Sequence, residues 1–408
     1  MRGKKIDGFV TRRQALADFF AAWEPAMQTE EVSLAQAAGR ICADRVYSKL
    51  TLPVYRVSSC DGIAVAAGRV QNEREKIADW RIGIDFARAD TGDDFDDCFD
   101  AVIPIEEIDL DPDGKIAFLS PDVEIKAGSN TSPRGSTLVE GDLLMEGNLP
   151  IRATDLASLA MGGANFVKVW RKPRVAFIPT GSELIPPGNT PKRGENIDTN
   201  SMMVQQMLLE FGAEPVMYPI VRDNPKELER TLKDALSTVD IVVLNAGTAK
   251  GSEDFNTPML GDNGKLIHHY VAAAPGRPMA LAVVDHKPVI NLPGPAMAAF
   301  FGMDWCVRAA INRFLNQPMP QRERITGRLM ESIRSTEHMA TLTRINVRKE
   351  GEDYLLYPLS LHRYSLPLCL ASNAMYVSEV GEAGVEKGEE IEVELLRGRE
   401  MMEGRMRS

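Results

Sequence analysis

Cysteine and histidine are scarce in this sequence, which has five of each among 408 residues. The cysteines are scattered, odd in number and without a Cys-X-X-Cys pair, so they fit neither a disulfide framework nor a cysteine metal site. The histidines also lack metal-ligand spacing, and adjacent His268 and His269 would point to opposite faces of a strand. We therefore expect ordinary structural or surface roles for the histidines, and a reducing cytoplasm as the location.

Long apolar runs are absent as well. No run approaches the roughly 18 residues that a membrane-spanning helix requires. The first residues, MRGKKIDGF, include basic side chains, but no apolar segment follows them, so no secretory signal is visible. We expect no membrane partner.

Positive charge is in deficit, with 47 lysines and arginines against 58 acidic residues and a net charge of −11. This balance argues against a general nucleic-acid binder and against an anionic membrane surface as partner. It does not argue against an anionic small molecule, because such a ligand responds only to the local field.

What the sequence does contain is a regular alternation of strand and helix patterns after Arg174. The runs RVAFIPTG, EPVMYPIV, IVVLNAG and KPVINLPG read as strands, and amphipathic segments between and after them read as helices. This alternation predicts a parallel sheet with helices on both faces, which binds ligands beyond the carboxyl ends of its strands. Two helices capped by Thr11 and Ser33 are predicted near the start, a β-rich region follows, and short strands after Pro318 predict a small β-barrel.

The loop after the predicted strand 241–245 is the strongest candidate for ligand contact. It contains Gly247, Thr248 and Gly251, and Asp254 closes it. Glycines let backbone N–H groups approach an anion, and carboxylates hold hard cations. The loop matches neither a Walker motif nor GxGxxG, so a phosphate loop and a plain turn both remain open.

Other motifs allow two interpretations each. Asp61-Gly62 fits either a functional position or a plain turn, because Asp-Gly is the commonest turn pair. Glu183 in PTGSEL suits the first turn of a helix, and Asp223 in RDNP suits a helix cap or a surface acid. Arg277 in APGRP suits an anion contact or any surface turn.

The order of the motifs is more specific than any one of them. LPVYRVSSCDGIAV, RVAFIPTGSEL, NIDTNS, RDNP, NAGTAKGSEDF, APGRP and NLPG follow one another with consistent gaps. Over nearly the whole chain this order resembles the MoeA family, the molybdopterin molybdenumtransferases, which include the E domain of gephyrin. The resemblance implies that adenylylated molybdopterin and molybdate are the substrates, and that a divalent cation, Mg²⁺, assists hydrolysis of the adenylyl group with release of AMP.

The same resemblance implies a multidomain α/β plus β fold and a homodimer. The active cleft is expected between the α/β domain of one subunit and the β-rich domain of the other. The expected parts are a helical linker domain from residues 1–50 and 140–172, a β-rich domain 51–139, an α/β molybdopterin-binding domain 173–317 and a C-terminal β-barrel 318–408.

Matching the family motifs residue by residue implies two sets of site residues. The expected catalytic residues, which are also the expected metal ligands, are Asp61, Glu183, Asp223 and Asp254. The expected contacts to molybdopterin and its phosphates are Thr91, Thr180, Gly181, Gly247, Thr248, Gly251, Arg277 and Gly294.

The sequence departs from the family pattern on the ligand side. The family's KPGKP is APGRP here, with Ala274 and Arg277 in place of two lysines, and LPGNPVSA is LPGPAMAA, with Pro295 and Ala298 in place of Asn and Ser. Each lost charge-assisted hydrogen bond removes roughly 1.5–3 kcal/mol of binding free energy. Further departures are Ser182, Ala246, Ala249 and Thr137.

Three functions remain open from the sequence. The first is molybdenum insertion in molybdenum-cofactor biosynthesis. The second is a catalytically weakened paralogue that binds or carries molybdopterin. The third is a divergent enzyme that acts on another nucleotide-linked anion. The lost anchors favour the second and the third, whereas the retained acids favour the first and the third. The choice between molybdenum and tungsten, and the identity of any partner enzyme, are not encoded in a readable pattern.

Overall fold

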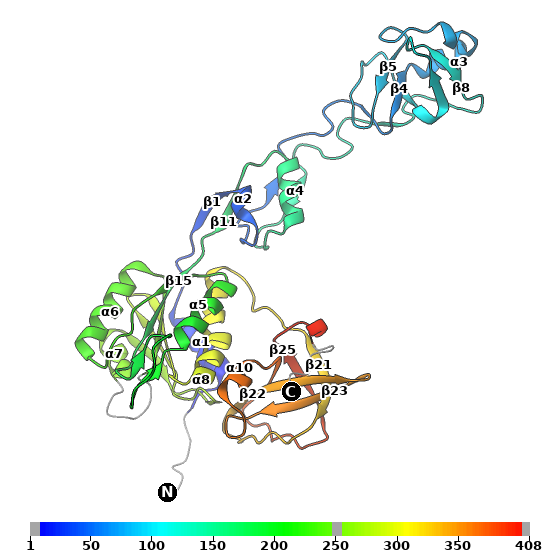
Figure 1. Cartoon of the computed structure of the whole chain (residues 1–408). Helices are drawn as coiled ribbons and strands as arrows, with labels where there is room; N and C mark the ends of the chain where they lie inside the picture. Colours follow the sequence, from blue (N-terminus) through cyan, green and yellow to red (C-terminus); the bar gives the residue numbers. More distant parts are fainter. Residues whose placement is uncertain (1–8, 247–254, 402–408) are drawn as a thin grey trace. The chain divides into compact units, whose positions relative to one another are not determined.

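The computed structural model describes residues 9–246 and 255–401. The chain divides into two compact units: residues 29–170 form one, and the segments that flank them form the other (Figure 1). Strand β1 (Thr29–Ser33) opens the inserted unit and β11 (Phe166–Trp170) closes it. The two strands pair antiparallel over their full lengths, so the entry and exit of the inserted unit lie side by side.

The first core of the inserted unit surrounds this strand pair. Its other elements are β2 (Val46–Tyr47), β10 (Leu143–Met145), α2 (Leu34–Ala37) and α4 (Ala153–Met161). Leu159 and Val169 are fully buried in it. The helix predicted after Ser33 is only one turn long, because the chain turns at Gly39, whose φ of 73° leaves the helical region.

The second core of the inserted unit is β-rich, as the sequence predicts. Its elements are β3 (Val57–Ser58), β4 (Gly62–Val65), α3 (Ala67–Asn72), η1 (Arg74–Asp79), β5 (Phe86–Ala89), β6 (Ala101–Pro104), η2 (Ile105–Glu107), β7 (Ile108–Leu110), β8 (Ile116–Leu119) and β9 (Thr131–Ser132). Strand β4 lies between β5 and β6, with Ile63, Phe86 and Ile103 buried around it. A Cβ on Gly62 would lie 2.0 Å from the Ile103 carbonyl oxygen. Asp61-Gly62 therefore opens a closely packed strand and is more than a turn.

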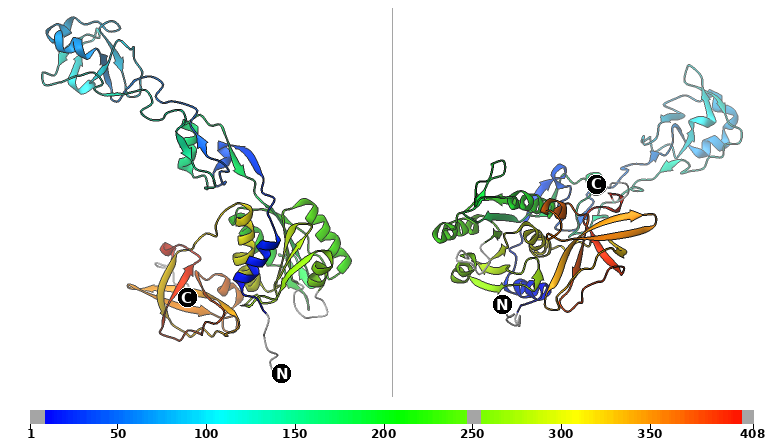
Figure 2. Two further views of the ribbon diagram at one scale, coloured as in Figure 1. Left: turned by 180° about the vertical axis from the view of Figure 1, so that it is seen from behind. Right: turned by 60° about the horizontal axis from the view of Figure 1, so that its bottom comes forward.

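The flanking segments build the predicted α/β sheet. Its strands are β12 (Arg174–Pro179), β15 (Glu214–Met217), β16 (Ile241–Asn245), β17 (Lys265–His269), β19 (Ala280–Val284) and β20 (Lys287–Leu292), and the helices beside it are α5 (Asn200–Glu210), α6 (Pro225–Thr238), α7 (Asn256–Asn263), α8 (Ala296–Gly302), η3 (Met303–Val307) and α9 (Arg308–Phe314). The strand order is β15-β12-β16-β20-β19-β17, with the first four strands parallel. Helices cover both faces (Figures 1 and 2).

The sequence of helix α6 determines where the helix begins and which of its sides packs against the sheet. Asn224 caps it through Oδ1, which accepts from the N–H groups of Lys226 and Glu227, and Pro225 occupies the first turn. Leu228, Leu232 and neighbouring apolar side chains of α6 then form a buried stripe against β12 and β16.

The first helix packs differently from the prediction. Helix α1 (Arg12–Ala22) is capped by Thr11 as predicted, but it lies against β17 and β19. Asp18 Oδ2 lies 2.7 Å from His268 Nε2, and this hydrogen bond lowers the pKa of Asp18. The described residues 9–28 thus group with the α/β sheet and not with residues 140–170, because α1 packs against β17 and β19. The other predicted domain boundaries stay predictions.

A closed barrel of five strands follows. Its elements are β21 (Arg324–Leu329), β22 (Ala340–Glu350), β23 (Asp353–Leu359), α10 (Leu366–Leu370), β24 (Ala374–Ser378), β25 (Glu390–Leu395) and η4 (Arg399–Met401). Closure occurs because β22 pairs with both β23 and β24. Strand β18 (Ala273–Ala274), from the α/β segment, adds to β22. Among the helices that the structure describes, none combines the length and hydrophobicity of a membrane span.

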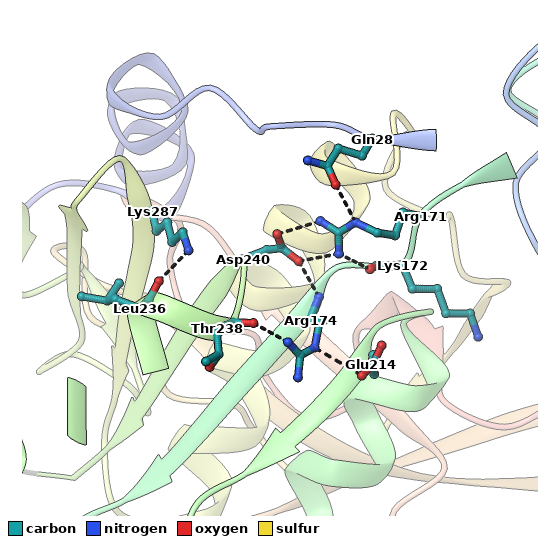
Figure 3. Close-up of polar contacts among 9 residues, drawn as sticks. All are labelled: Gln28, Arg171, Lys172, Arg174, Glu214, Leu236, Thr238, Asp240 and Lys287. Carbon is teal, nitrogen blue, oxygen red and sulfur yellow. Dashed lines mark hydrogen bonds and ion pairs between the residues drawn. The ribbon is translucent and has the colours of Figure 1, made fainter. Parts of the chain in front are cut away.

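A charged cluster fixes the amino-terminal edge of the sheet (Figure 3). The guanidinium group of Arg171 donates to both carboxylate oxygens of Asp240, at 2.8 and 2.9 Å, and to the side chain of Gln28 at 3.2 Å. Asp240 also accepts from the Arg174 backbone N–H at 2.7 Å. The two chain segments that lead to and from residues 29–170 are therefore tied to the starts of β12 and β16.

A matched pair of leucine substitutions tests the sheet core. Leu232→Ala removes a side chain that is 1% exposed on α6, and we expect the free energy of unfolding to fall by about 2–5 kcal/mol. Leu209→Ala, at a 50% exposed position on α5, serves as the control and should cost less than about 1 kcal/mol. Urea unfolding followed by circular dichroism measures both, and equal destabilisation would contradict this packing.

Candidate functional site

Four parallel strands end at one edge of the α/β sheet. Strands β12, β15, β16 and β20 share one direction, so the segments after Pro179, Met217, Asn245 and Leu292 leave from the same edge. The segment 270–279 reaches this edge too, because Ala280 at the start of β19 pairs with Asn291. This is the position where open α/β sheets bind ligands.

Asp223 joins two of these loops. Its Oδ2 accepts a hydrogen bond from the Ser182 N–H at 2.7 Å, and the Asp223 N–H donates to Ser182 Oγ at 3.0 Å. Asn224, and not Asp223, caps helix α6. Ser182, which departs from the family pattern, thus holds the half-buried carboxylate of Asp223 at the edge.

Glu183 precedes a short strand and not a helix. Strand β13 (Leu184–Ile185) pairs with β14 (Asn196–Ile197), and Glu183 is exposed just before them. Its carboxylate lies over Gly181, where an added Cβ would be 2.5 Å from Glu183 Oε2. Gly181 also has a φ of 145°, so this position needs glycine for both space and conformation. The predicted Gly181 and Glu183 are therefore neighbours at the site.

Beneath the loops lies a layer of buried asparagines that the sequence analysis did not select. Asn200, the first residue of α5, donates from Nδ2 to Asn245 Oδ1 at 2.8 Å and to the Gly294 carbonyl at 2.7 Å. Asn245 in turn donates to the Pro293 carbonyl at 2.8 Å and accepts the Thr180 hydroxyl at its backbone oxygen, at 2.9 Å. These bonds connect the ends of three strands.

A second pair of asparagines holds the turn after β16. Asn256 Nδ2 donates to the Ala246 carbonyl at 2.7 Å and to Asn291 Oδ1 at 3.2 Å. Ala246 has a φ of 88°, a conformation that costs a non-glycine residue about 1–2 kcal/mol. The asparagine contact therefore stabilises an alanine where the family pattern has glycine.

Two atoms of this layer are unsatisfied. Asn200 Oδ1 and Asn291 Nδ2 are buried without a hydrogen-bond partner within the described ranges. Such groups are exceptions in native proteins and cost about 1–3 kcal/mol each. They mark this edge as a place where a further polar group would complete the hydrogen bonding.

The departures from the family pattern meet beside this layer. Pro295 precedes α8, and a Cβ on Gly276 would lie 4.0 Å from the Ala298 carbonyl, so the APGRP turn touches the start of α8. Gly294 lies close to Ala246, which an added Cβ would meet at 3.4 Å. Arg277 is exposed, with its guanidinium carbon 5.9 Å from the Phe9 ring centre.

The hydroxyl group of Thr180, a residue predicted to contact the ligand, does not face the ligand side of the edge. Thr180 is 3% exposed and its hydroxyl is directed inward to Asn245, so it supports the edge from below. The predicted residues Gly247, Thr248, Gly251 and Asp254 lie outside the described residues.

Asp61 and Thr91 belong to the inserted unit. Asp61 Oδ1 accepts from the Thr91 N–H at 2.7 Å and from its hydroxyl at 2.8 Å. The backbone hydrogen bond and then the hydroxyl lower the pKa of Asp61, so this exposed carboxylate is held in its ionised form. The predicted pair is thus assembled within its own unit.

The described residues alone do not gather a cluster of metal ligands. No group of three histidine, cysteine or acidic side chains within 9–246 and 255–401 is arranged to hold a metal. Glu183 and Asp223 nevertheless place two carboxylates on adjoining loops. Magnesium commonly binds through one or two carboxylates together with water and substrate phosphates, so these two acids fit that mode.

Comparison with known proteins identifies the family. Residues 10–163 match the family described as "MoeA N-terminal region (domain I and II)", and residues 176–345 match the "Probable molybdopterin binding domain". A crystal structure of a molybdopterin biosynthesis MoeA protein from Pyrococcus horikoshii aligns with 96% of this chain and 100% of its own, at 25% identity and a TM-score of 0.79. The chain belongs to the MoeA family.

Curated MoeA-family relatives are similar over most of their length. The molybdopterin molybdenumtransferase of Haemophilus influenzae is 28% identical over 304 residues, which cover 71% of this chain and 74% of that protein. That of Bacillus subtilis is 25% identical over 388 residues, which cover 91% of this chain and 90% of the relative. The fold predicted from the motif order, an α/β domain, a β-rich domain and a C-terminal barrel, is confirmed.

An isosteric substitution tests the asparagine layer of this MoeA-family member. Asn200→Asp keeps the side-chain shape but replaces two donated hydrogen bonds with contacts between oxygen atoms. We expect the free energy of unfolding to fall by about 1–3 kcal/mol or more, because Asn200 is 7% exposed.

The matched control is Asn189→Asp. Asn189 also donates to a backbone carbonyl, that of Pro186 at 3.0 Å, but it is exposed. Urea unfolding of both variants provides the measurement. If the two substitutions had the same small effect, the layer would not hold the edge together.

Proposed function

We propose that this MoeA-family protein is a molybdopterin molybdenumtransferase that acts in molybdenum-cofactor biosynthesis. It takes adenylylated molybdopterin and molybdate, releases AMP, and leaves molybdenum on the dithiolene sulfurs of molybdopterin. The relatives named molybdopterin molybdenumtransferase, which align with most of this chain, support the proposal.

The observation that carries the proposal is the convergence of loops at the carboxyl edge of the sheet. Asp223, Glu183 and the glycine-bearing turns after β12 and β20 meet there above the asparagine layer. Exposed backbone N–H groups at such an edge suit phosphate groups. A pure scaffold would have no need to fix Asp223 by two hydrogen bonds at this place, so the arrangement favours an enzyme over a carrier.

The proposal includes a magnesium ion held by Glu183 and Asp223, with Asp254 and Asp61 as further ligands expected from the family pattern. When bound, the ion would neutralise charge on the adenylyl phosphates. The chain's own contribution is to hold the Asp223 carboxylate in place through Ser182, and to present Gly181 and Gly294 where backbone can approach the ligand closely.

Contacts to the pterin and its phosphates are proposed for Thr91, Gly181, Gly294 and Arg277. Thr180 supports the site through its hydrogen bond to the Asn245 carbonyl. Arg277 is the described cation of the APGRP turn, and its exposed guanidinium is free to meet an oxyanion in a bidentate manner. It supplies charge where the family pattern has two lysines. We expect weaker ligand binding than in relatives with both lysines, and not the loss of turnover.

A homodimer is part of the proposal. Asp61 and Thr91 lie in the inserted unit, whereas Asp223 and Glu183 lie on the α/β sheet. The family resemblance implies that the cleft combines the α/β domain of one subunit with the β-rich domain of its partner.

The first experiment measures AMP release by the full-length protein. Adenylylated molybdopterin and Mg²⁺ are supplied, and molybdate is then added. We expect AMP release that depends on molybdate, with Asp223→Asn lowering the rate at least about tenfold, because the fixed negative charge is lost while the Ser182 contact survives.

Asp234→Asn is the matched control, since this exposed acid on α6 bonds only to the Tyr218 hydroxyl at 2.8 Å in the described structure. It should leave the rate unchanged. Tight binding of the adenylylated substrate without AMP release would identify a carrier, and the absence of both would overturn the proposed reaction.

The shared cleft predicts complementation between two inactive variants. Mixed dimers of Asp61→Asn and Asp223→Asn subunits contain one cleft with both substitutions and one with neither. Mixing the two purified variants gives mixed dimers if their subunits exchange. If they do not exchange, the two variants are co-expressed with different affinity tags, and the mixed dimer is isolated through both tags. We expect about half of the wild-type AMP release from mixed dimers, compared with the loss of at least about tenfold in either parent. Mixed dimers as inactive as both parents would show that each cleft lies within one subunit.

A further inference from the structure

A basic cavity of about 350 Å³ lies between the helices beside the α/β sheet and the C-terminal barrel. It is separate from the site above. Helix α5 begins at that site with Asn200 and ends at the cavity with Glu210, so the length of the helix, roughly 15 Å, lies between them.

Arginine dominates the charged lining of the cavity. Four arginines and two carboxylates face it, together with apolar side chains that include two phenylalanine rings. The charged lining residues are Arg308, Arg322, Arg344, Arg397, Glu210 and Asp304. Positive charge therefore exceeds negative charge in a partly enclosed space.

The carboxylate of Asp304 is shared between Arg322 and Arg308. Asp304 accepts from both terminal nitrogens of Arg322, one of them at 3.0 Å, and Arg322 also lies 3.6 Å from Glu394. Arg308 reaches the same Asp304 only at 3.8 Å. The strong pairing of Asp304 with Arg322 leaves Arg308 incompletely neutralised.

Arg344 is the most unusual of the four. It is 4% exposed, its Nε donates to Ser372 Oγ, and its Nη2 donates to the Leu370 carbonyl at 2.8 Å. Its guanidinium lies 4.4 Å from the Phe300 ring centre. Its Nη1 is buried with no hydrogen-bond partner, and no carboxylate in the described part of the chain pairs with it. Burial lowers the pKa of Arg344 to about 10, because removal from water disfavours the charged form.

Arg308 and Arg397 complete the positive side of the cavity. Arg308 lies over the Phe211 ring at 5.0 Å, and burial lowers its pKa as well. Arg397 follows β25, is exposed, and has no acidic partner among the described residues. One buried, one half-buried and one exposed cation, Arg344, Arg308 and Arg397, thus line the same space.

The helix that carries Asp304 and Arg308 is itself irregular at this point. Between α8 and α9 the residues Met303–Val307 form a π-helical turn. Such turns are rare, and they occur frequently at functional sites, where they redirect side chains. Asp304, within this turn, and Arg308, directly after it, both line the cavity.

We propose that this cavity binds a small tetrahedral oxyanion, with Arg308, Arg344 and Arg397 as donors. Guanidinium groups match the oxygen geometry of such anions, and a dianion would offset the excess positive charge of the lining. Phosphate, sulfate and molybdate share this chemistry. The inference does not depend on the proposed function, because the cavity contains none of the residues assigned to that reaction.

The test is isothermal titration of the full-length protein with sodium phosphate, sulfate and molybdate at constant ionic strength. We expect saturable binding of at least one oxyanion, and the preferred one identifies the natural class. Arg308→Gln and Arg397→Gln should each weaken that binding about tenfold, since each removes a charge-assisted hydrogen bond.

Two controls separate this cavity from the rest of the surface. Arg230→Gln, at an exposed position on α6, should leave oxyanion affinity unchanged. Asp234→Asn, the control substitution for AMP release, should also leave it unchanged.

The result that overturns the proposal is the absence of saturable binding of all three anions at millimolar concentration, or unchanged affinity in both cavity variants. Circular dichroism checks that the variants fold. Should Arg308→Gln fail this check, Arg397→Gln decides the question alone, because Arg397 is exposed and makes no described ion pair.

Discussion

The parallel pairing of β16 with β12 and β20 is the constraint on which the candidate site depends. Because the three strands run in one direction, their following loops must leave from one edge, and residues far apart in sequence meet there. At the opposite edge, Asp240 and Arg171 tie the starts of the same strands to the segments that lead to the inserted unit. The sheet therefore holds both the edge of the candidate site and the chain segments at Gln28 and Arg171.

Buried amides give this edge its particular character. A layer of asparagines connects the turns after β12, β16 and β20. It also holds Ala246 in a conformation that the family pattern reserves for glycine. At this one departure from the family pattern, a side-chain hydrogen bond from Asn256 stabilises the changed residue.

Buried charge distinguishes the two regions of interest. At the sheet edge, the Asp223 carboxylate accepts a hydrogen bond from the Ser182 N–H on a neighbouring loop, and the Asp223 N–H donates to Ser182 Oγ. In the basic cavity, Asp304 is shared and Arg344 has no acidic partner in the described structure. A buried cation without a counter-ion is costly, and its retention is understandable if an anion completes the arrangement.

The sequence by itself determined the alternation of strands and helices, the cap at Thr11, and the motif order that identifies the family, because these depend on local spacing. It also placed Asp223, Glu183 and Gly181 in segments that follow predicted strands, and the structure has them at the carboxyl edge of the sheet. It could not place α1 on the sheet, since one apolar helix face fits many partners. Only the tertiary structure joined Ser182 to Asp223, Asn200 to Gly294, and the arginines of the basic cavity to one another. Those contacts link residues 41 and 94 positions apart in the first two cases. Their partners are chosen by sheet register and helix packing, which no local pattern encodes.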